Sequence, residues 1–194
     1  MESKYDIKVI LSGEFTTGRT CFIFRLIDSV FPDQGPYFLP NGQATKTYEI
    51  EGKTLTFQIY DVMGSADFRE QPPSYYQDAM GAIILYDITN EDTFQKVPFF
   101  IQEVRRYADS KAVIMLIGSK CDLENDRKIS TSEGAELSKR EGLIFYEASP
   151  INGTNVHEAF AAMATKILHV LEGKEEPKQT NNKNGKDKSI CNLS

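Results

Sequence analysis

Short apolar runs alternate with longer amphipathic segments along most of the chain. The runs have the length of buried strands, and the longer segments repeat apolar residues with helical spacing. Strands are predicted at residues 5–12, 46–61, 82–87, 112–118 and 144–147, and the second range divides into two strands at Glu51-Gly52-Lys53. Helices are predicted at residues 20–28, 91–107, 130–141 and 156–171. This order predicts a three-layer α/β fold, with helices on both faces of a mostly parallel six-stranded sheet that has one antiparallel edge strand.

Two long irregular segments, at residues 31–44 and 62–73, interrupt the pattern. In open α/β sheets, ligands bind beyond the carboxyl ends of the strands, and both segments follow or precede a predicted strand. Everything after residue 172 is polar and lacks the apolar residues that a packed core needs. We therefore expect one folded domain at residues 1–172 and a disordered, variable tail at residues 173–194.

The charge balance restricts the partners that the chain can have. Its 194 residues include 28 acidic and 22 basic side chains, for a net charge of -6, which argues against general nucleic-acid binding. The apolar run at residues 7–11 is too short for a signal peptide, and no run approaches the ~20 apolar residues that span a bilayer. Three cysteines far apart in the chain do not suggest a disulfide framework or a zinc cluster, so we expect a cytosolic protein.

The segment GEFTTGRT, at residues 13–20, has the outline of a phosphate-binding loop between a strand and a helix. Gly13 and Gly18 let backbone N–H groups close around an anion, and the following helix adds its positive end. Arg19 supplies the cation where the pattern asks for lysine, and Thr20 supplies the hydroxyl that binds magnesium. The alternative is an ordinary strand-to-helix turn.

At two further strand ends, the sequence has residues that can bind parts of a nucleotide. At the first, the carboxylate of Asp61 can hold magnesium through water and the amide of Gly64 can meet a γ-phosphate. At the second, Ser119-Lys120-Cys121-Asp122 follows a strand, and Asp122 can accept both N–H groups of a guanine edge while the Lys120 stem covers the ring.

These elements, in this order, resemble the small GTPases, and the Rab family most of all. The resemblance runs from about residue 5 to residue 171 and is densest in TYEIEGKTLTFQIYD, SYYQDAMGAIILYDITNEDTF, GSKCDL and NVHEAF. It implies a monomeric P-loop G domain that binds GTP or GDP with Mg²⁺, hydrolyses GTP slowly, and works with exchange proteins, activating proteins and membrane effectors. The resemblance assigns nucleotide binding to Gly13, Phe15, Thr16, Thr17, Gly18, Arg19, Thr20, Cys21, Gly64, Ser119, Lys120, Asp122, Ser149 and Pro150, and metal binding to Thr20 and Asp61.

The phosphate loop departs from the family pattern. Phe15 and Thr16 stand where the family usually has small residues, and the ring of Phe15 is expected to obstruct an incoming arginine finger. Thr16 occupies a position where glycine would permit positive φ, so the loop is either strained or reshaped. Arg19 keeps the charge, but its planar fork is not equivalent to an ammonium. Ser65 replaces the glutamine that orients the attacking water, so no catalytic residue is assigned.

The switch and base segments are altered as well. Phe38 aligns with the threonine that senses γ-phosphate. Of the three aromatic positions that present the effector surface in Rab proteins, two are Tyr60 and Tyr75, and the third is Gln43. Ser119 replaces the common asparagine. Pro150 has no N–H to offer to guanine O6, so weaker guanine binding is expected.

The chain finishes Cys191-Asn192-Leu193-Ser194, which fits a prenylation box that favours farnesyl, although Asn192 is not aliphatic. The tail lysines can supply the second membrane signal that a single lipid needs, at Lys174, Lys178, Lys183, Lys186 and Lys188. A free terminal cysteine is the alternative.

Two functions of different classes therefore remain open. One is a Rab-like switch in membrane trafficking, with weak GTP hydrolysis, on the cytoplasmic face of intracellular membranes and cycling with the cytosol. The other is a pseudo-GTPase, a membrane-tethered interaction module with weak or no nucleotide binding.

Overall fold

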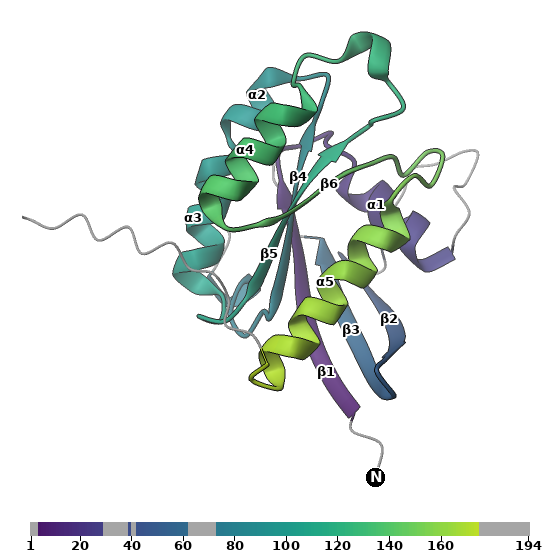
Figure 1. Cartoon of the computed structure of the whole chain (residues 1–194), viewed down its shortest axis with the longest axis vertical. Coiled ribbons are helices and arrows are strands. Elements are labelled where there is room, and N and C mark those ends of the chain that lie inside the picture. Colours follow the sequence, from purple (N-terminus) through teal and green to yellow (C-terminus); the bar gives the residue numbers. More distant parts are fainter. Residues whose placement is uncertain (1–3, 29–38, 40–41, 62–72, 175–194) are drawn as a thin grey trace, which may run out of the picture.

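The computed structural model describes residues 4–28, 39, 42–61 and 73–174, and these form one six-stranded sheet with helices on both faces (Figure 1). The strands are β1 (Lys4–Gly13), β2 (Gln43–Ile50), β3 (Lys53–Asp61), β4 (Gly81–Asp87), β5 (Val113–Ser119) and β6 (Ile144–Ala148). Their order in the sheet is β2-β3-β1-β4-β5-β6, with β2 antiparallel to β3 and every other pair parallel. The predicted fold is confirmed, including the single antiparallel edge strand.

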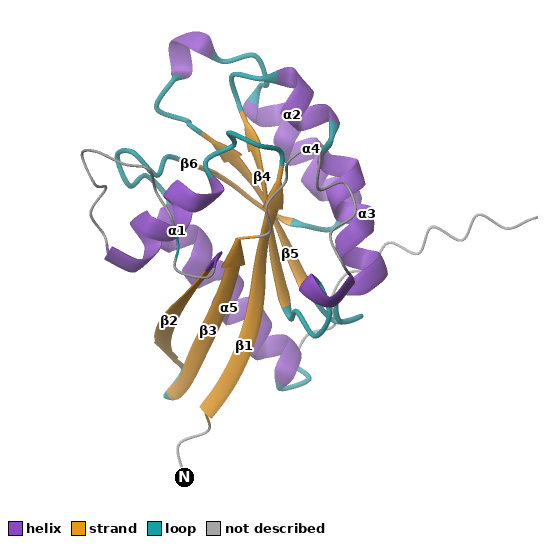
Figure 2. Ribbon diagram, turned by 180° about the vertical axis from the view of Figure 1, so that it is seen from behind, coloured by secondary structure: helices purple, strands orange, loops and turns teal. Residues whose placement is uncertain are grey.

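The helices form the two outer layers of the molecule. They are α1 (Arg19–Asp28), α2 (Glu91–Gln95), α3 (Val97–Tyr107), α4 (Thr131–Glu141) and α5 (Val156–Leu171), with single 3-10 turns η3 (Pro73–Tyr75) and η4 (Glu124–Asp126). The views from both sides show α1 and α5 on one face of the sheet and α2, α3 and α4 on the other (Figures 1 and 2). None of the described helices has the length and apolar composition needed to cross a membrane.

The structure differs from the predicted elements at residues 91–107, where one continuous helix is replaced by α2 and α3. The two helices meet at Lys96, and Pro98 lies in the first turn of α3. Proline has no N–H for the helical ladder, and its ring would clash with the carbonyl of Phe94 four residues earlier. The break therefore has a local cause that was already present in the sequence.

Strand β4 shows why the central apolar runs lack a polar face. Every residue of β4 is buried, because helices cover the sheet on both sides. Ile83 and Leu85 pack into the core beneath α1 and α5, whereas Ile84 and Tyr86 pack into the core beneath α3 and α4. The carboxyl ends of the parallel strands form one edge of the molecule, and the described residues of the predicted site follow these strand ends.

Candidate nucleotide-binding site

The described segments of the predicted site lie at the edge where the parallel strands end. The loop at residues 13–20 connects β1 to α1, Asp61 ends β3, and Ser119 ends β5. The segment after β5 is joined to the end of β6 by a hydrogen bond from the Cys121 amide to the Ala148 carbonyl oxygen, 3.4 Å long. Segments far apart in the sequence, such as those at Gly13 and Ala148, thus share one end of the sheet.

The phosphate loop keeps the backbone that the sequence predicted. Gly13 and Gly18 have positive φ, at 134° and 89°, and a Cβ on Gly13 would lie 2.3 Å from the carbonyl oxygen of Leu85. Thr16 also has positive φ, 65°, although it is β-branched. This φ agrees with the expectation of a strained backbone at Thr16, which costs roughly 1–3 kcal/mol.

The loop presents backbone donors that have no partner in the described part of the chain. None of the N–H groups of residues 16–20 donates a hydrogen bond to another described residue. The ten-residue helix α1 begins at Arg19 and adds its positive end to these amides. The hydroxyl of the buried Thr17 donates to the Glu14 carbonyl oxygen at 2.8 Å and braces the loop. Such a cradle suits a phosphate group.

The outer part of the loop carries an ion pair that the sequence did not reveal. Phe15 is 65% exposed, and its amide donates to Glu14 Oε1 at 3.1 Å. Lys96, at the junction of α2 and α3, pairs with Glu14 Oε2. Burial alone would raise the pKa of Glu14, but the hydrogen bonds from Lys96 and the Phe15 amide lower it below its ordinary value. Glu14 is therefore charged, and Lys96 offsets this negative charge beside the cradle.

The guanidinium of Arg19 is bound by the loop and by the neighbouring strand. Nη1 donates to the carbonyl oxygens of Gly13, at 2.5 Å, and Glu14, at 2.8 Å. Nε donates to Asp61 Oδ1 at 2.8 Å. Arginine has five N–H donors, and the two on Nη2 take no partner among the described residues. Arg19 is 8% exposed, so it is a buried cation, and within the described residues two of its donors are unpaired.

The two predicted metal ligands lie together, but the carboxylate is already engaged. Thr20 Oγ1 donates to Asp61 Oδ2 at 2.5 Å, while Oδ1 accepts the bond from Arg19. Both carboxylate oxygens of Asp61 thus accept a bond from the protein, and its side chain is 9% exposed. The cradle fits a nucleotide phosphate, whereas this carboxylate does not present the free oxygens that Mg²⁺ prefers.

Lys120 and Asp122 lie at the other end of the site, after β5. Lys120 has positive φ, 66°, and its Nζ lies 2.6 Å from Oδ2 of Asp87 at the end of β4. Asp122 is exposed, and its carboxylate accepts no hydrogen bond from another described residue. Asp87 was missed from the sequence, although it ends a buried strand just as Asp61 does. The arrangement holds the lysine in place and leaves the Asp122 carboxylate open to a ligand.

Ser119 is a buried polar residue whose hydroxyl has no hydrogen-bond partner in the described part of the chain. A Cβ on Gly18 would lie 3.1 Å from Ser119 Oγ, so the hydroxyl faces the phosphate loop. The serine side chain, which is shorter than the asparagine common in the family, thus leaves a hydrogen bond unmade at this position. Burial raises the pKa of the neighbouring Cys121 thiol and also that of Cys21, which favours packed, unreactive cysteines.

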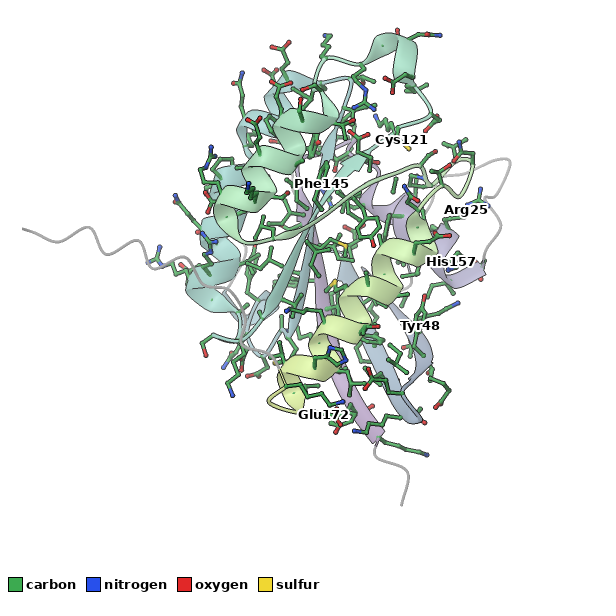
Figure 3. All side chains as sticks on the ribbon, viewed as in Figure 1. Arg25, Tyr48, Cys121, Phe145, His157 and Glu172 are labelled. Atoms are coloured by element: carbon green, nitrogen blue, oxygen red, sulfur yellow. The ribbon has the colours of Figure 1, made fainter. Side chains whose placement is uncertain are left out.

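An arginine of α1 holds the loop after β6. Arg25 Nε donates to the Pro150 carbonyl oxygen at 2.6 Å, and its Nη2 donates to the Ile151 carbonyl oxygen. The buried Ser149 donates its amide to the Thr154 carbonyl oxygen at 3.0 Å. Figure 3 shows Arg25 beside this loop, close to the start of α5. Arg25 was not predicted, because nothing local in α1 indicates a bond to a residue 125 positions away.

Several predicted site residues lie outside the described residues, so the structure places none of them: Phe38, Gly64, Ser65 and Cys191.

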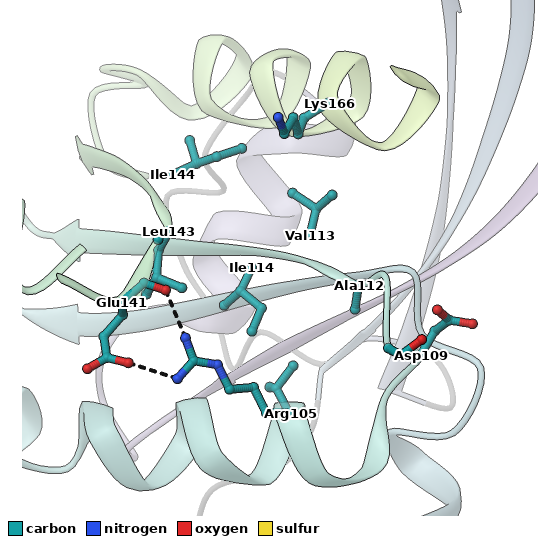
Figure 4. A pocket seen from close by; sticks show the side chains of 12 residues that line it. Arg105, Asp109, Ala112, Val113, Ile114, Glu141, Leu143, Ile144 and Lys166 are labelled. Atoms are coloured by element: carbon teal, nitrogen blue, oxygen red, sulfur yellow. Dashed lines mark hydrogen bonds and ion pairs between the residues drawn. The ribbon is translucent and has the colours of Figure 1, made fainter. Parts of the chain in front are cut away.

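A separate pocket of about 70 Å³ lies at the opposite edge of the sheet, where β5 and β6 begin (Figure 4). Arg105 of α3 spans it by donating to the Glu141 carboxylate and carbonyl oxygens, both at 2.8 Å. None of the predicted site residues lines it.

A loop that depends on glycine leads into the start of a helix, and carboxylates lie at the neighbouring strand ends. Together these features define an α/β protein of the nucleotide-binding class. The sequence matches the Ras family over residues 8–169, and the chain belongs to that family of small GTPases. It is 34% identical over 186 residues to the Ras-related protein Rab11A of Lotus japonicus, an alignment that covers 96% of this chain and 82% of the relative. It is 35% identical over 173 residues to the Ras-related protein RABA2b of Arabidopsis thaliana, covering 89% and 81%. The chain is therefore Rab-related, and members of this family bind GTP or GDP, generally with Mg²⁺.

Proposed function

We propose that this protein is a Rab-like switch that binds guanine nucleotide at the carboxyl edge of its sheet. The phosphates would lie against the amides of residues 16–20, and the base would lie against Lys120 and Asp122. The observation that carries the proposal is that, among the described residues, the amides of the loop and the carboxylate of Asp122 at the same edge have no hydrogen-bond partner. These two features supply donors for phosphate and an acceptor for the guanine N–H groups.

Calorimetric titration of nucleotide-stripped, folded protein tests this proposal. GTP and GDP should bind with measurable heat, and ATP should bind far more weakly, because adenine offers no pair of N–H groups to Asp122. Far-UV circular dichroism before the titration shows that the stripped protein is folded. Absence of binding at millimolar nucleotide would favour a pseudo-GTPase, the alternative suggested by the engaged Asp61 carboxylate.

Hydrolysis of GTP is proposed to be slow. Ser65 and Phe38 replace the residues that orient water and sense γ-phosphate in the family. Positioning and electrostatics supply nearly all catalysis of phosphoryl transfer, so their loss should lower the rate on the order of 10²-fold or more. Single-turnover phosphate release from wild type and Ser65→Gln measures the effect. A wild-type rate typical of the family would contradict the proposal.

Membrane attachment is proposed to depend on the tail at residues 173–194, beyond the folded domain at residues 1–172. A farnesyl group on Cys191 would bind only marginally, and the tail lysines would add a salt-sensitive attraction to anionic lipids. Cys191→Ser should release the protein from cell membranes, and replacement of Lys183, Lys186 and Lys188 by glutamine should weaken its attachment. Attachment that survives Cys191→Ser would rule out the lipid as the main membrane anchor.

The proposed partners are exchange proteins, activating proteins and effectors. Gln43 lies opposite Tyr60 in the register of β2 and β3, and Tyr75 is 45% exposed. Lys8 Nζ lies 5.3 Å from the centre of the Tyr60 ring. Because an amide replaces one of the family's three aromatic positions, the effector set is proposed to differ from that of a typical Rab.

A further inference from the structure

The ion pair between Arg19 and Asp61 lies where members of this family place a metal ion. Its two side chains are 8% and 9% exposed, and the distance between Nε and Oδ1 is 2.8 Å. We propose that the Arg19 guanidinium takes the place of Mg²⁺ beside Asp61, so that nucleotide binding by this protein depends little on Mg²⁺. This inference rests on the proposed binding of guanine nucleotide.

The shape of arginine makes this arrangement possible. A guanidinium is a planar fork with donors in three directions, whereas an ammonium is a compact charge on a flexible stem. Arg19 uses these directions separately: Nε bonds to Asp61, and Nη1 bonds to the carbonyl oxygens of Gly13 and Glu14. A lysine at this position has a single nitrogen and cannot bridge the carboxylate and both carbonyl oxygens through separate atoms.

The charges of the pair weaken the attraction for a divalent ion. Asp61 is the carboxylate that the metal would use, and Arg19 neutralises it within a buried contact. The second oxygen of Asp61 accepts a bond from Thr20, at 2.5 Å. Mg²⁺ would have to displace a buried partner to reach this carboxylate, and breaking a buried ion pair is unfavourable.

The same side chain retains the donors that a phosphate requires. Nη2 of Arg19 takes no partner among the described residues, so its two N–H groups remain as donors for a phosphate. A phosphate bound by the amides of residues 16–20 would contact the Arg19 cation, which also bonds to Asp61. Arg19 would thus link phosphate and carboxylate, as a metal ion does.

A competing explanation is that nucleotide and Mg²⁺ together pull Arg19 away from Asp61 and restore the metal site of the family. The two explanations differ in how nucleotide release responds to a chelator. If Arg19 supplies the bridge, removal of Mg²⁺ changes release little. If the ion supplies it, removal of Mg²⁺ accelerates release strongly.

Release of N-methylanthraniloyl-GDP from the full-length protein measures this difference, in excess Mg²⁺ and in excess EDTA. Wild type should release the nucleotide at rates that agree within about twofold in the two buffers. In Arg19→Lys, nucleotide binding should again depend on Mg²⁺. EDTA should then accelerate release by roughly 5- to 150-fold, the usual range for two coupled ligands. Arg140→Lys makes the same exchange at an exposed position of α4 and should behave as wild type.

A second measurement tests the wild-type protein directly, in case Arg19→Lys fails to fold. Binding of Mn²⁺ to the nucleotide-loaded protein, followed by electron paramagnetic resonance, should be no tighter than binding of Mn²⁺ to the free nucleotide. Tighter Mn²⁺ binding, or strong acceleration of wild-type release by EDTA, would overturn the inference and leave the proposed function standing. A chain that binds no guanine nucleotide in either buffer would overturn both.

Discussion

The two ends of the candidate site accommodate their unusual residues in opposite ways. At the phosphate end, Arg19 has protein partners for most of its donors, including a buried contact with Asp61. At the base end, the Ser119 hydroxyl has no partner and the Asp122 carboxylate is exposed and unbonded within the described residues. The two charged side chains of the phosphate end thus bond to each other, whereas the Ser119 hydroxyl and the Asp122 carboxylate have no such partner among the described residues. Substitutions at the first should change stability, and substitutions at the second should change binding.

The largest expected effect separates two aspartates of the site. Asp61→Ala leaves Arg19 as a buried, unpaired cation and should lower the free energy of unfolding by about 3–5 kcal/mol. Asp122→Ala removes an exposed side chain and should change it by no more than about 0.5 kcal/mol. Urea unfolding without nucleotide measures both. Equal destabilisation by the two variants would contradict the proposed difference between the phosphate end and the base end of the site.

Asp122→Ala should instead weaken nucleotide binding. Hydrogen bonds to a charged group contribute about 1.5–3 kcal/mol, so affinity for GTP should fall roughly 10- to 150-fold, with little change for ATP. Titration calorimetry on the variant gives the dissociation constants for GTP and for ATP. Asp126→Ala is the control, because this exposed aspartate lies in η4, outside the predicted site. If Asp122→Ala binds GTP as wild type does, the base lies elsewhere.

Ser119→Asn should tighten binding by a smaller amount. The longer amide can reach across to the phosphate loop, where the Ser119 hydroxyl lies 3.1 Å from the position of a Cβ on Gly18. A neutral hydrogen bond contributes about 0.5–1.5 kcal/mol, which corresponds to roughly a 2- to 12-fold gain in affinity for GDP. Ser132→Asn, an exposed exchange on α4, should leave affinity unchanged. A loss of affinity in Ser119→Asn would show that the asparagine does not fit beside Gly18.

The smallest effect concerns the pH dependence of the phosphate end. Burial opposes ionisation of Glu14, but Lys96 and the Phe15 amide lower its pKa in the folded protein below the ordinary value of 4.5. Because the folded pKa is the lower one, the ionised group stabilises the protein above pH 4.5, and this contribution is lost as pH falls through the folded value.

Glu14→Gln should therefore lower stability by less than about 1 kcal/mol near neutral pH, since Lys96 is half exposed, and the difference should shrink in acid. Urea midpoints at several pH values measure the change. Glu136→Gln on α4 removes an exposed glutamate away from the site and serves as the control. A difference between wild type and Glu14→Gln that grows as pH falls would contradict the assigned sign.

The strands and the loop backbone were predictable because their causes are local. Fully buried β4 reads as an uninterrupted apolar run, and the positive φ of Thr16 follows from its place in a glycine-dependent loop. The end of α2 was predictable too, since Pro98 stands in the sequence, but the amphipathic pattern on both sides of it concealed the break. The adjacency of the site segments followed from their common position at strand ends.

The side-chain partners were not predictable, because they join residues far apart in the chain. Arg19 reads from the sequence as a cation aimed at phosphate, yet its Nε bonds to Asp61, 42 positions away on another strand. Lys96 reaches Glu14 across 82 positions, and Arg25 reaches Pro150 across 125. Local pattern sets which residues form a strand or a turn. Which donor meets which acceptor depends on how the elements pack, and here that packing pairs the loop cation with the carboxylate expected to hold the metal.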